Sequence, residues 1–144
     1  MIKAGIIGST GYAGQELVRL LMQHPDVEIV WYGSRSYIDQ QYADVFQNMF
    51  QIVDAKCMDD NMDALADAAD VIFTATPQGL CAYLGNEDVL NKVKIIDLSA
   101  DFRINDVEVY EKWYGIKHKS TSYIKKEVNG LSTTNREDIK GERM

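Results

Sequence analysis

The chain has 144 residues, of which 46% are hydrophobic and 26% charged, a composition that suits one globular domain with its own core. Its net charge of -7 and pI of about 4.7 exclude a broad basic face, so we expect neither a nucleic-acid partner nor binding to an anionic membrane. No apolar run approaches the roughly 18 residues of a membrane span. No signal-peptide pattern opens the sequence either, and we therefore expect a cytoplasmic protein.

The two cysteines give no sign of a metal site or a disulfide framework. Cys57 and Cys81 stand far apart and lack metal-ligand spacing. This use of cysteine suits a reducing compartment, and we expect both side chains to be buried as small apolar groups. We therefore predict no metal ligands.

A glycine-rich turn follows the first apolar run. Residues Ile2–Ile7 are apolar almost throughout, which is typical of a central parallel strand, and a helical pattern begins at Gln15. The turn between them consists of Gly8, Ser9, Thr10, Gly11, Tyr12, Ala13 and Gly14. Strand, turn and helix in this order are typical of the first βα unit of a dinucleotide-binding fold, where the helix N-terminus receives a pyrophosphate. The alternative is a plain strand-to-helix turn without a ligand.

A second candidate loop follows the next predicted strand, Val27–Tyr32. Ser34, Arg35 and Ser36 stand about 20 residues past the last glycine of the turn, where an NAD-binding domain would carry Asp or Glu for the ribose 2′-hydroxyl. The guanidinium and two hydroxyls suit a 2′-phosphate instead, which predicts NADP as the cofactor. A solvated surface arginine is the alternative.

The rest of the chain alternates helices and strands, which predicts an α/β fold with a doubly wound, Rossmann-like parallel sheet in one domain spanning residues 1–144. Residues 37–56 have no dominant period, and we expect irregular structure with a short strand near Phe50–Asp54. The further predicted elements are a helix at 61–69, a strand at 70–75, a helix at 80–90, a strand at 93–98, a helix at 107–114 with Trp113 as its aromatic anchor, and a helix at 135–143 that begins at Asn135.

Two more loops follow predicted strands and are candidate site residues. Thr76, Pro77 and Gln78 stand where a nicotinamide ribose would pass, although this segment could equally be a helix cap. The run 99–103 brings a hydroxyl, a carboxylate and a guanidinium to one strand end, although Asp101 could merely pair with Arg103. His118 falls in a predicted loop, and we expect it at the surface.

Three motifs in this order resemble the N-acetyl-gamma-glutamyl-phosphate reductases of arginine biosynthesis. They are Gly-Ser-Thr-Gly-Tyr-Ala-Gly-Gln-Glu-Leu at 8–17, Ala-Thr-Pro-Gln-Gly at 75–79 and Asp-Leu-Ser-Ala-Asp-Phe-Arg at 97–103. Similarity continues through 110–115, 130–131 and 135–137. The aspartate-semialdehyde dehydrogenases share the glycine turn but lack this form of the third motif, and they rank second. The other alternative is a non-catalytic NADP-sensing module.

The resemblance implies an NADP-dependent acyl-phosphate reductase, an oxidoreductase that reduces N-acetyl-glutamyl phosphate to the semialdehyde and releases phosphate. Carried over by position, Gly8–Gly14 and Ser34–Ser36 would bind NADP, Thr76–Gln78 and Ser99 would flank the nicotinamide, and Arg103 would meet the substrate phosphate.

The resemblance also implies what this chain leaves out. The family's nucleophilic cysteine stands in an Asn-Pro-Gly-Cys motif that would lie beyond Met144, together with the substrate domain. We therefore expect the 144 residues to be the NADP-binding part, inactive alone and prone to self-association, with the whole protein a homo-oligomer. Ser132-Thr133-Thr134 departs from the family's Pro-Glu-apolar sequence.

Overall fold

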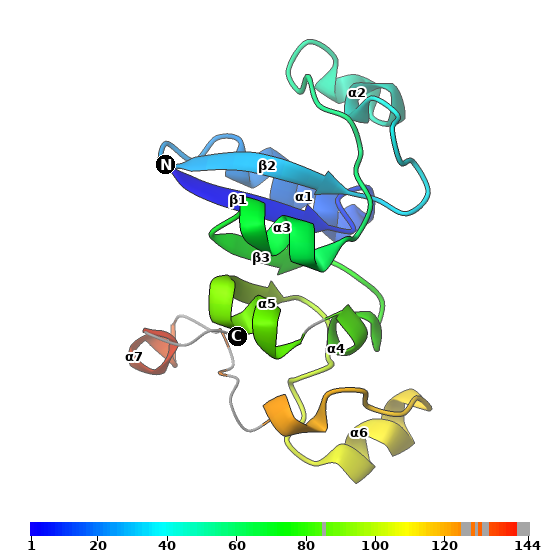
Figure 1. Cartoon of the computed structure of the whole chain (residues 1–144), viewed down its shortest axis with the longest axis vertical. Coiled ribbons are helices and arrows are strands. Elements are labelled where there is room, and N and C mark those ends of the chain that lie inside the picture. The colour runs from blue at the N-terminus through cyan, green and yellow to red at the C-terminus, as the bar shows by residue number, and fades with distance from the viewer. Residues whose placement is uncertain (85, 125–127, 129, 131–132, 141–144) are drawn as a thin grey trace.

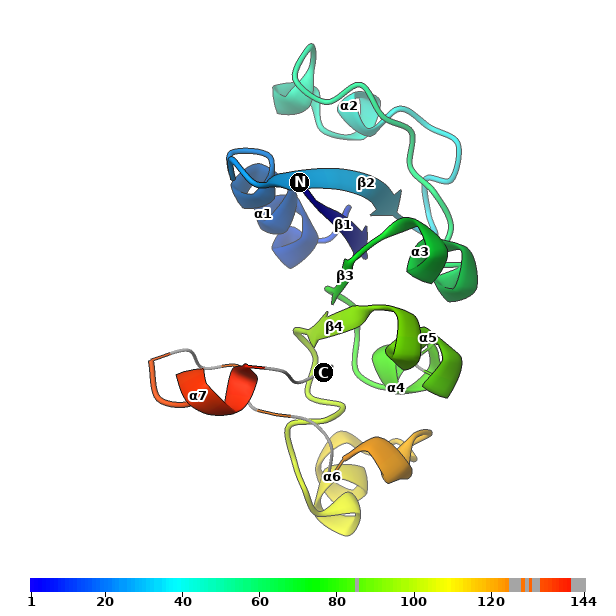
Figure 2. The ribbon, with the colours of Figure 1, turned by 60° about the vertical axis from the view of Figure 1, so that its left-hand side comes forward.

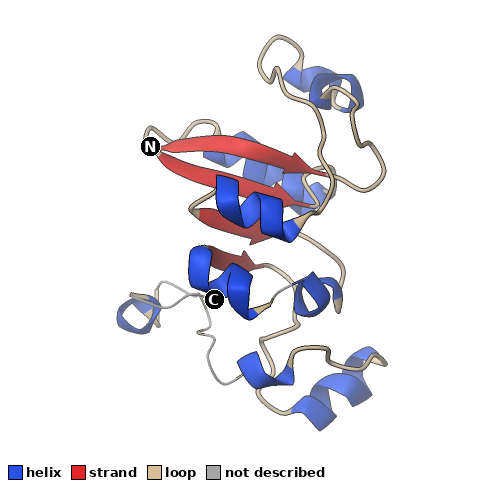
Figure 3. Cartoon of the chain, in the orientation of Figure 1, coloured by secondary structure: helices blue, strands red, loops and turns tan. Residues whose placement is uncertain are grey.

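A parallel β-sheet forms the centre of the protein, which we describe from a computed structural model over residues 1–84, 86–124, 128, 130 and 133–140, with residue 83 by its backbone alone. Its order is β2-β1-β3-β4, and the strands are β1 (Ile2–Ile7), β2 (Val27–Gly33), β3 (Val71–Thr74) and β4 (Lys94–Asp97). Figure 1 shows the strands side by side, and Figure 3 separates them from the helices by colour.

The sheet is covered on both faces, as its apolar strands predict. Helix α1 (Tyr12–Leu21) lies on one face, and α3 (Met62–Ala68) and α5 (Glu87–Lys92) lie on the other (Figure 2). Strand β1 is central, pairing with both β2 and β3, and Ala4, Ile6 and Ile7 are at most 2% exposed. The predicted doubly wound α/β fold is confirmed.

Each face of the sheet has its own apolar core. Ile6 on one side of β1 packs with Val18 of α1, and Ile7 on the other side packs with Leu65 of α3. This alternation follows from the strand period of two, which sends successive side chains to opposite faces. The sheet therefore buries apolar groups on both sides of its central strand.

The predicted strand near Phe50–Asp54 is wrong. The segment forms α2 (Tyr42–Val45), a 3-10 turn η1 (Gln47–Met49) and then a turn in which Gln51 has a φ of 60°. Residues 42–53 thus form a lobe whose buried apolar residues, Tyr42, Met49 and Val53, pack with Val18 of α1, and so their spacing does not follow a strand.

The predicted helix at 80–90 is two short helices, α4 (Leu80–Leu84) and α5. Asn86 begins α5, because its side-chain oxygen accepts a hydrogen bond from the Val89 N–H at 3.0 Å. A residue that satisfies a helix N-terminus in this way starts a new helix instead of continuing the earlier one.

Helix α6 (Val107–Tyr114) is confirmed, but its predicted aromatic anchor is wrong. Trp113 is 79% exposed, whereas Tyr110 is fully buried. The two residues are three positions apart, and Tyr110 has a buried hydrogen-bond partner for its hydroxyl, described below.

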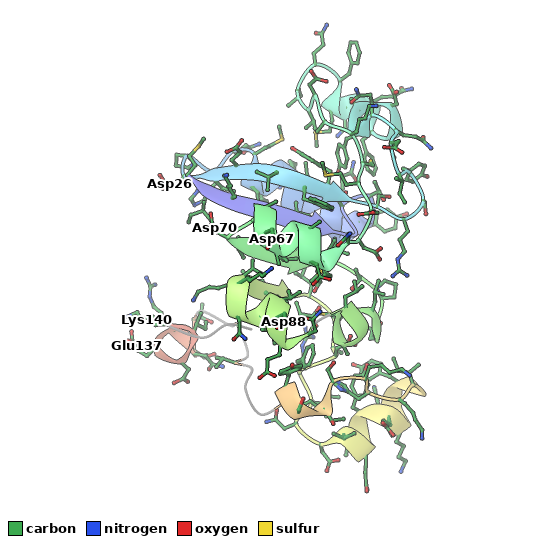
Figure 4. All side chains as sticks on the ribbon, in the orientation of Figure 1. Asp26, Asp67, Asp70, Asp88, Glu137 and Lys140 are labelled. Carbon is green, nitrogen blue, oxygen red and sulfur yellow. The ribbon has the colours of Figure 1, made fainter. Side chains whose placement is uncertain are left out.

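The end of the chain agrees in part with its predicted helix. Helix α7 (Arg136–Ile139) begins after Asn135 as predicted, and Glu137 and Lys140 form an ion pair of 2.9 Å on its exposed side (Figure 4). The predicted continuation to residue 143 and the departure at Ser132 lie outside the described residues. Within the described part of the chain, no helix is both long and apolar enough to cross a bilayer.

Candidate functional site

The glycine turn lies at the point where the chain changes from one face of the sheet to the other. It follows β1, whose neighbours are β2 and β3, so the turn stands between the carboxyl ends of strands connected on opposite faces. In open α/β sheets, ligands bind outside the carboxyl ends of the strands at such a change of face.

Two glycines allow the turn to pack against neighbouring backbone. Gly8 has a φ of 80°, and a Cβ there would lie 2.3 Å from the Ala75 carbonyl oxygen in the loop after β3. A Cβ on Gly14 would lie 2.0 Å from the Gly8 carbonyl oxygen. Neither contact leaves room for a side chain, so both positions require glycine.

The beginning of α1 is open for an anion. Gly11 is its N-cap and offers no side-chain cap, and the first turn holds no acidic residue. Gly11, Tyr12 and Ala13 are exposed, with Tyr12 at 96%. The N–H groups of a first helical turn lack intrahelical partners and point out of the helix, and so they can receive a pyrophosphate.

Ser9 and Thr10 have structural partners inside the turn. Ser9 is fully buried, and its hydroxyl donates to the Gly33 carbonyl oxygen at 3.0 Å. Its own carbonyl accepts from the Tyr42 hydroxyl at 2.9 Å, a contact that sequence reasoning missed because the chain around Tyr42 has no clear period. The hydroxyls of Thr10 and Ser34 are 2.8 Å apart. These contacts fix the glycine turn to the end of β2.

Arg35 lies at the carboxyl end of β2 and forms an ion pair. Its Nε donates to Oδ2 of Asp60 at 2.5 Å, and its side chain is 59% exposed. Ser36 beside it is exposed as well. Asp60 stands 25 residues further along the chain, and no local motif marks it as a partner of Arg35.

The loop after β3 contains a buried hydroxyl that lacks a hydrogen bond. Among the described side chains, Oγ1 of Thr76 is buried without a partner, which costs roughly 1–3 kcal/mol. Thr76 also lies against the glycine turn, since its Cγ2 is 3.5 Å from where a Cβ on Gly8 would be. Pro77 and Gln78 are exposed at the same end of the sheet.

The loop after β4 uses its polar groups internally. The Ser99 hydroxyl donates to Oδ2 of Asp97 at 2.7 Å and accepts from the Asp101 N–H at 3.1 Å. The Thr74 hydroxyl donates to the other oxygen of Asp97 at 2.7 Å. The exposed side chain of Arg103 donates to the Ser99 carbonyl at 3.3 Å. Ser99 therefore shapes this loop through hydrogen bonds within it.

The alternative in which Asp101 pairs with Arg103 is wrong. It is fully buried, and its carboxylate accepts hydrogen bonds from the Gly79 N–H at 2.6 Å, the Ala82 N–H at 2.9 Å and the Tyr110 hydroxyl at 2.8 Å. A carboxylate with three donors is satisfied without a cation. Asp101 therefore fastens the loop after β3 and helix α4 to helix α6.

His118 is buried, so the predicted surface position is wrong. It is 8% exposed, and its ring lies 5.0 Å from that of Tyr110 and 5.3 Å from that of Phe102. The Ser120 N–H donates to Nδ1 at 3.2 Å, so Nε2 bears the proton and donates it to the Asp101 carbonyl oxygen. The histidine extends the Asp101 network.

The two cysteines are buried, as predicted, and each is 1% exposed. Burial raises the pKa of both Cys57 and Cys81, which disfavours the thiolate form. Among the described residues, no group of three or more His, Cys, Asp or Glu side chains lies together in a way that could hold a metal ion.

The structure thus brings the four predicted loops to one end of the sheet, because each follows the carboxyl end of one of the parallel strands β1, β2, β3 and β4. A glycine turn that begins a helix at the sheet's change of face is typical of a dinucleotide-binding class of domain. The family model described as "Semialdehyde dehydrogenase, NAD binding domain" matches residues 3–142, and the chain belongs to this family.

The chain is similar to curated proteins named N-acetyl-gamma-glutamyl-phosphate reductase. It is 67% identical over 144 residues to that of Lachnoclostridium phytofermentans, covering 100% of this chain and 42% of the relative. It is 67% identical over 139 residues to that of Lachnospira eligens, covering 96% and 40%. For that of Desulforudis audaxviator the identity is 44% over 141 residues, covering 98% and 41%. The chain therefore spans about two fifths of the length of these relatives.

A solved structure supports the fold. The crystal structure of aspartate semialdehyde dehydrogenase with NADP from Candida albicans matches with a TM-score of 0.55 and 22% identity, covering 72% of this chain and 31% of that one. At this identity the likeness concerns the fold alone.

Replacing Gly14 with alanine tests the packing of the turn. The added Cβ meets the Gly8 carbonyl, so we expect the free energy of unfolding to fall by about 3 kcal/mol or more in urea titrations. Gly11→Ala is the matched control, because its Cβ would make only an ordinary contact of 3.4 Å, and its cost should stay within about 1 kcal/mol. Equal costs for the two variants would refute this account of the turn.

Replacing Tyr110 with phenylalanine tests the Asp101 network. The variant removes one donor from a buried carboxylate, and we expect the free energy of unfolding to fall by about 1–3 kcal/mol. Tyr114→Phe keeps the ring contact of 5.0 Å with Tyr110 and serves as the control, with a smaller expected effect. The network loses its assigned role if Tyr110→Phe is as stable as the unmodified chain.

Proposed function

We propose that this chain is the NADP-binding part of an N-acetyl-gamma-glutamyl-phosphate reductase, which would use NADPH to convert an acyl phosphate into a semialdehyde and inorganic phosphate. The observation that supports it most is the open N-terminus of α1 at the sheet's change of face, with Arg35 beside it. The relatives of 67% identity have this name, and the matching solved structure is described as holding NADP.

The residues of the first two loops fit such a cofactor. The backbone N–H groups at Tyr12 and Ala13 would bind the pyrophosphate, and Gly8 and Gly14 permit the turn that presents them. Arg35 and the exposed Ser36 would bind the 2′-phosphate. Ser9, Thr10 and Ser34 have partners within the protein. They would support the site by fixing the turn to β2.

The residues of the other two loops would face the reacting end of the cofactor. Thr76 lies beside the glycine turn, and together with the exposed Pro77 and Gln78 it would flank the nicotinamide, which supplies a hydride when the cofactor is bound. Ser99 would contribute by shaping its loop, and the exposed Arg103 would meet the substrate phosphate. Nothing in this assignment requires a metal ion.

The nucleophile would come from outside these 144 residues. An acyl-phosphate reductase of this kind needs a thiolate, and burial with a raised pKa makes Cys57 and Cys81 poor candidates. The chain alone would thus bind the cofactor without catalysing the reaction. A non-catalytic NADP-sensing module would bind in the same way, and the segment Asn-Pro-Gly-Cys after Met144 in the gene would favour the reductase.

Self-association and a cytoplasmic setting belong to the same proposal. Strand β4 lies at the edge of the described sheet and exposes Ile96 at 47%, with Leu98 just beyond it at 39%. An apolar edge of this kind favours packing against further protein, so a homo-oligomer is expected.

Cofactor titration tests the proposal. We expect the chain to bind NADPH at least about tenfold more tightly than NADH, because a charge-assisted contact to the 2′-phosphate contributes roughly 1.5–3 kcal/mol. Arg35→Ala should remove this preference and leave NADH binding unchanged, as measured by nicotinamide fluorescence. An absence of NADPH binding, or a preference for NADH that Arg35→Ala does not alter, would disprove the cofactor assignment.

Thiol labelling tests the statement about the cysteines. We expect both thiols of the folded chain to react at least about tenfold more slowly with a disulfide reagent at pH 8 than those of the chain in denaturant, because they are buried and poorly ionised. Rapid labelling of Cys81 in the folded chain would make it a nucleophile candidate after all.

A further inference from the structure

Arg35, the residue proposed to select NADP, is held by an acidic residue from another part of the chain. Its Nε donates to Oδ2 of Asp60 at 2.5 Å. The Asp60 side chain is 23% exposed and that of Arg35 is 59% exposed, so the carboxylate is the more enclosed partner. The acid thus stands at the carboxyl end of β2, where the local sequence lacks one.

The segment before α3 is fixed to β2 and to Ser34, the residue after it, by three hydrogen bonds. The Ser34 N–H donates to the Met58 carbonyl at 2.7 Å, and the Met58 N–H donates to the Tyr32 carbonyl at 2.9 Å. The Trp31 indole N–H donates to the Asp59 carbonyl at 2.8 Å. Asp60, which follows Met58 and Asp59, therefore has a defined position relative to the end of β2.

The start of α3 fixes the same segment from its other side. Asn61, directly after Asp60, is the N-cap of α3 and accepts from the Ala64 N–H at 3.1 Å. The Asp59 carboxylate accepts from the Asn61 N–H at 3.1 Å. Asp59 is thus used within the segment, which leaves Asp60 as the neighbouring carboxylate that contacts Arg35.

The contact through Nε determines which donors of Arg35 remain. A guanidinium is planar, and its N–H groups have fixed directions. The Nε–H donates to Asp60 and the side chain as a whole is 59% exposed. The N–H groups at the end of the guanidinium, one on each terminal nitrogen, are left to form a fork that can bind a phosphate in a bidentate manner.

We propose that Asp60 is a positioning residue for cofactor selectivity. It orients Arg35 so that the terminal nitrogens face the 2′-phosphate of NADPH, and it strengthens NADPH binding without touching the cofactor. This inference rests on the proposed function, because it requires the 2′-phosphate to lie at Arg35.

Asp60 also brings a negative charge near the phosphate, and this charge opposes its positioning effect. The charge acts at longer range across a partly exposed site, where solvent and salt screen it. The hydrogen bond acts directly on the guanidinium. Asparagine separates the two effects, because its side-chain oxygen can still accept from Nε while the charge is gone.

The experiment is a titration of NADPH and NADH into the purified chain and its variants Asp60→Ala, Asp60→Asn, Arg35→Ala and the double variant Arg35→Ala/Asp60→Ala. We expect Asp60→Ala to weaken NADPH binding about threefold to tenfold and to leave NADH binding within about twofold. Asp60→Asn should keep NADPH binding within about twofold of the unmodified chain or strengthen it. In the Arg35→Ala background, Asp60→Ala should have no further effect.

The control is Asp67→Asn, which removes a carboxylate from the last turn of α3 (Figure 4). Asp67 pairs with Lys92 at 2.6 Å. We expect this variant to bind both cofactors like the unmodified chain. Thermal unfolding of every variant separates an effect on binding from a loss of folded protein.

Several results would overturn the inference. Unchanged or tighter NADPH binding in Asp60→Ala would mean that the acid only competes with the phosphate. Equal losses for NADPH and NADH, or a further loss in the Arg35→Ala background, would mean a general structural role. A loss for NADH alone would make Asp60 an acceptor for the ribose hydroxyl. If the unmodified chain does not bind NADPH, the proposed function fails together with this inference.

Discussion

The site depends on a close backbone contact between two loops that follow neighbouring strands. The turn after β1 approaches the loop after β3 so closely that a Cβ at Gly8 would lie 2.3 Å from the Ala75 carbonyl oxygen. The Ala75 N–H in turn donates to the Ile7 carbonyl at 2.9 Å. Because of this contact, the loop that contains Thr76 lies against the turn that begins α1, and the proposed dinucleotide would span both.

Other contacts serve to hold this arrangement in place. Ser9, through Gly33 and Tyr42, fixes the turn to β2 and to the lobe that follows it. On the opposite side, the buried carboxylate of Asp101 fastens the loop after β3 to Tyr110 of α6. Several hydroxyls and carboxylates of the predicted site thus have structural partners. The groups left for the proposed cofactor are backbone N–H groups, exposed side chains and the unpaired Thr76 hydroxyl.

The fold and the four loops could be predicted from the sequence because their signals are local. A buried strand, a glycine turn and a helix start each lie within a few residues of one another. The contacts that the sequence did not reveal join distant positions, as with Asp60 and Arg35, which are 25 residues apart. The prediction of Trp113 as the aromatic anchor of α6 is wrong, because the helical pattern does not distinguish it from Tyr110. Tyr110 is the buried residue, since its hydroxyl has a buried hydrogen-bond partner in Asp101.

We propose above that NADPH binds at the carboxyl end of the sheet, with its pyrophosphate at the start of α1. Backbone amide NMR during an NADPH titration tests it most directly, because each N–H reports on its own surroundings. We expect the largest shifts at Gly11, Tyr12 and Ala13, together with Arg35, and small shifts in the lobe around α2. Shifts confined to that lobe, or absent from the turn at saturating NADPH, would contradict it.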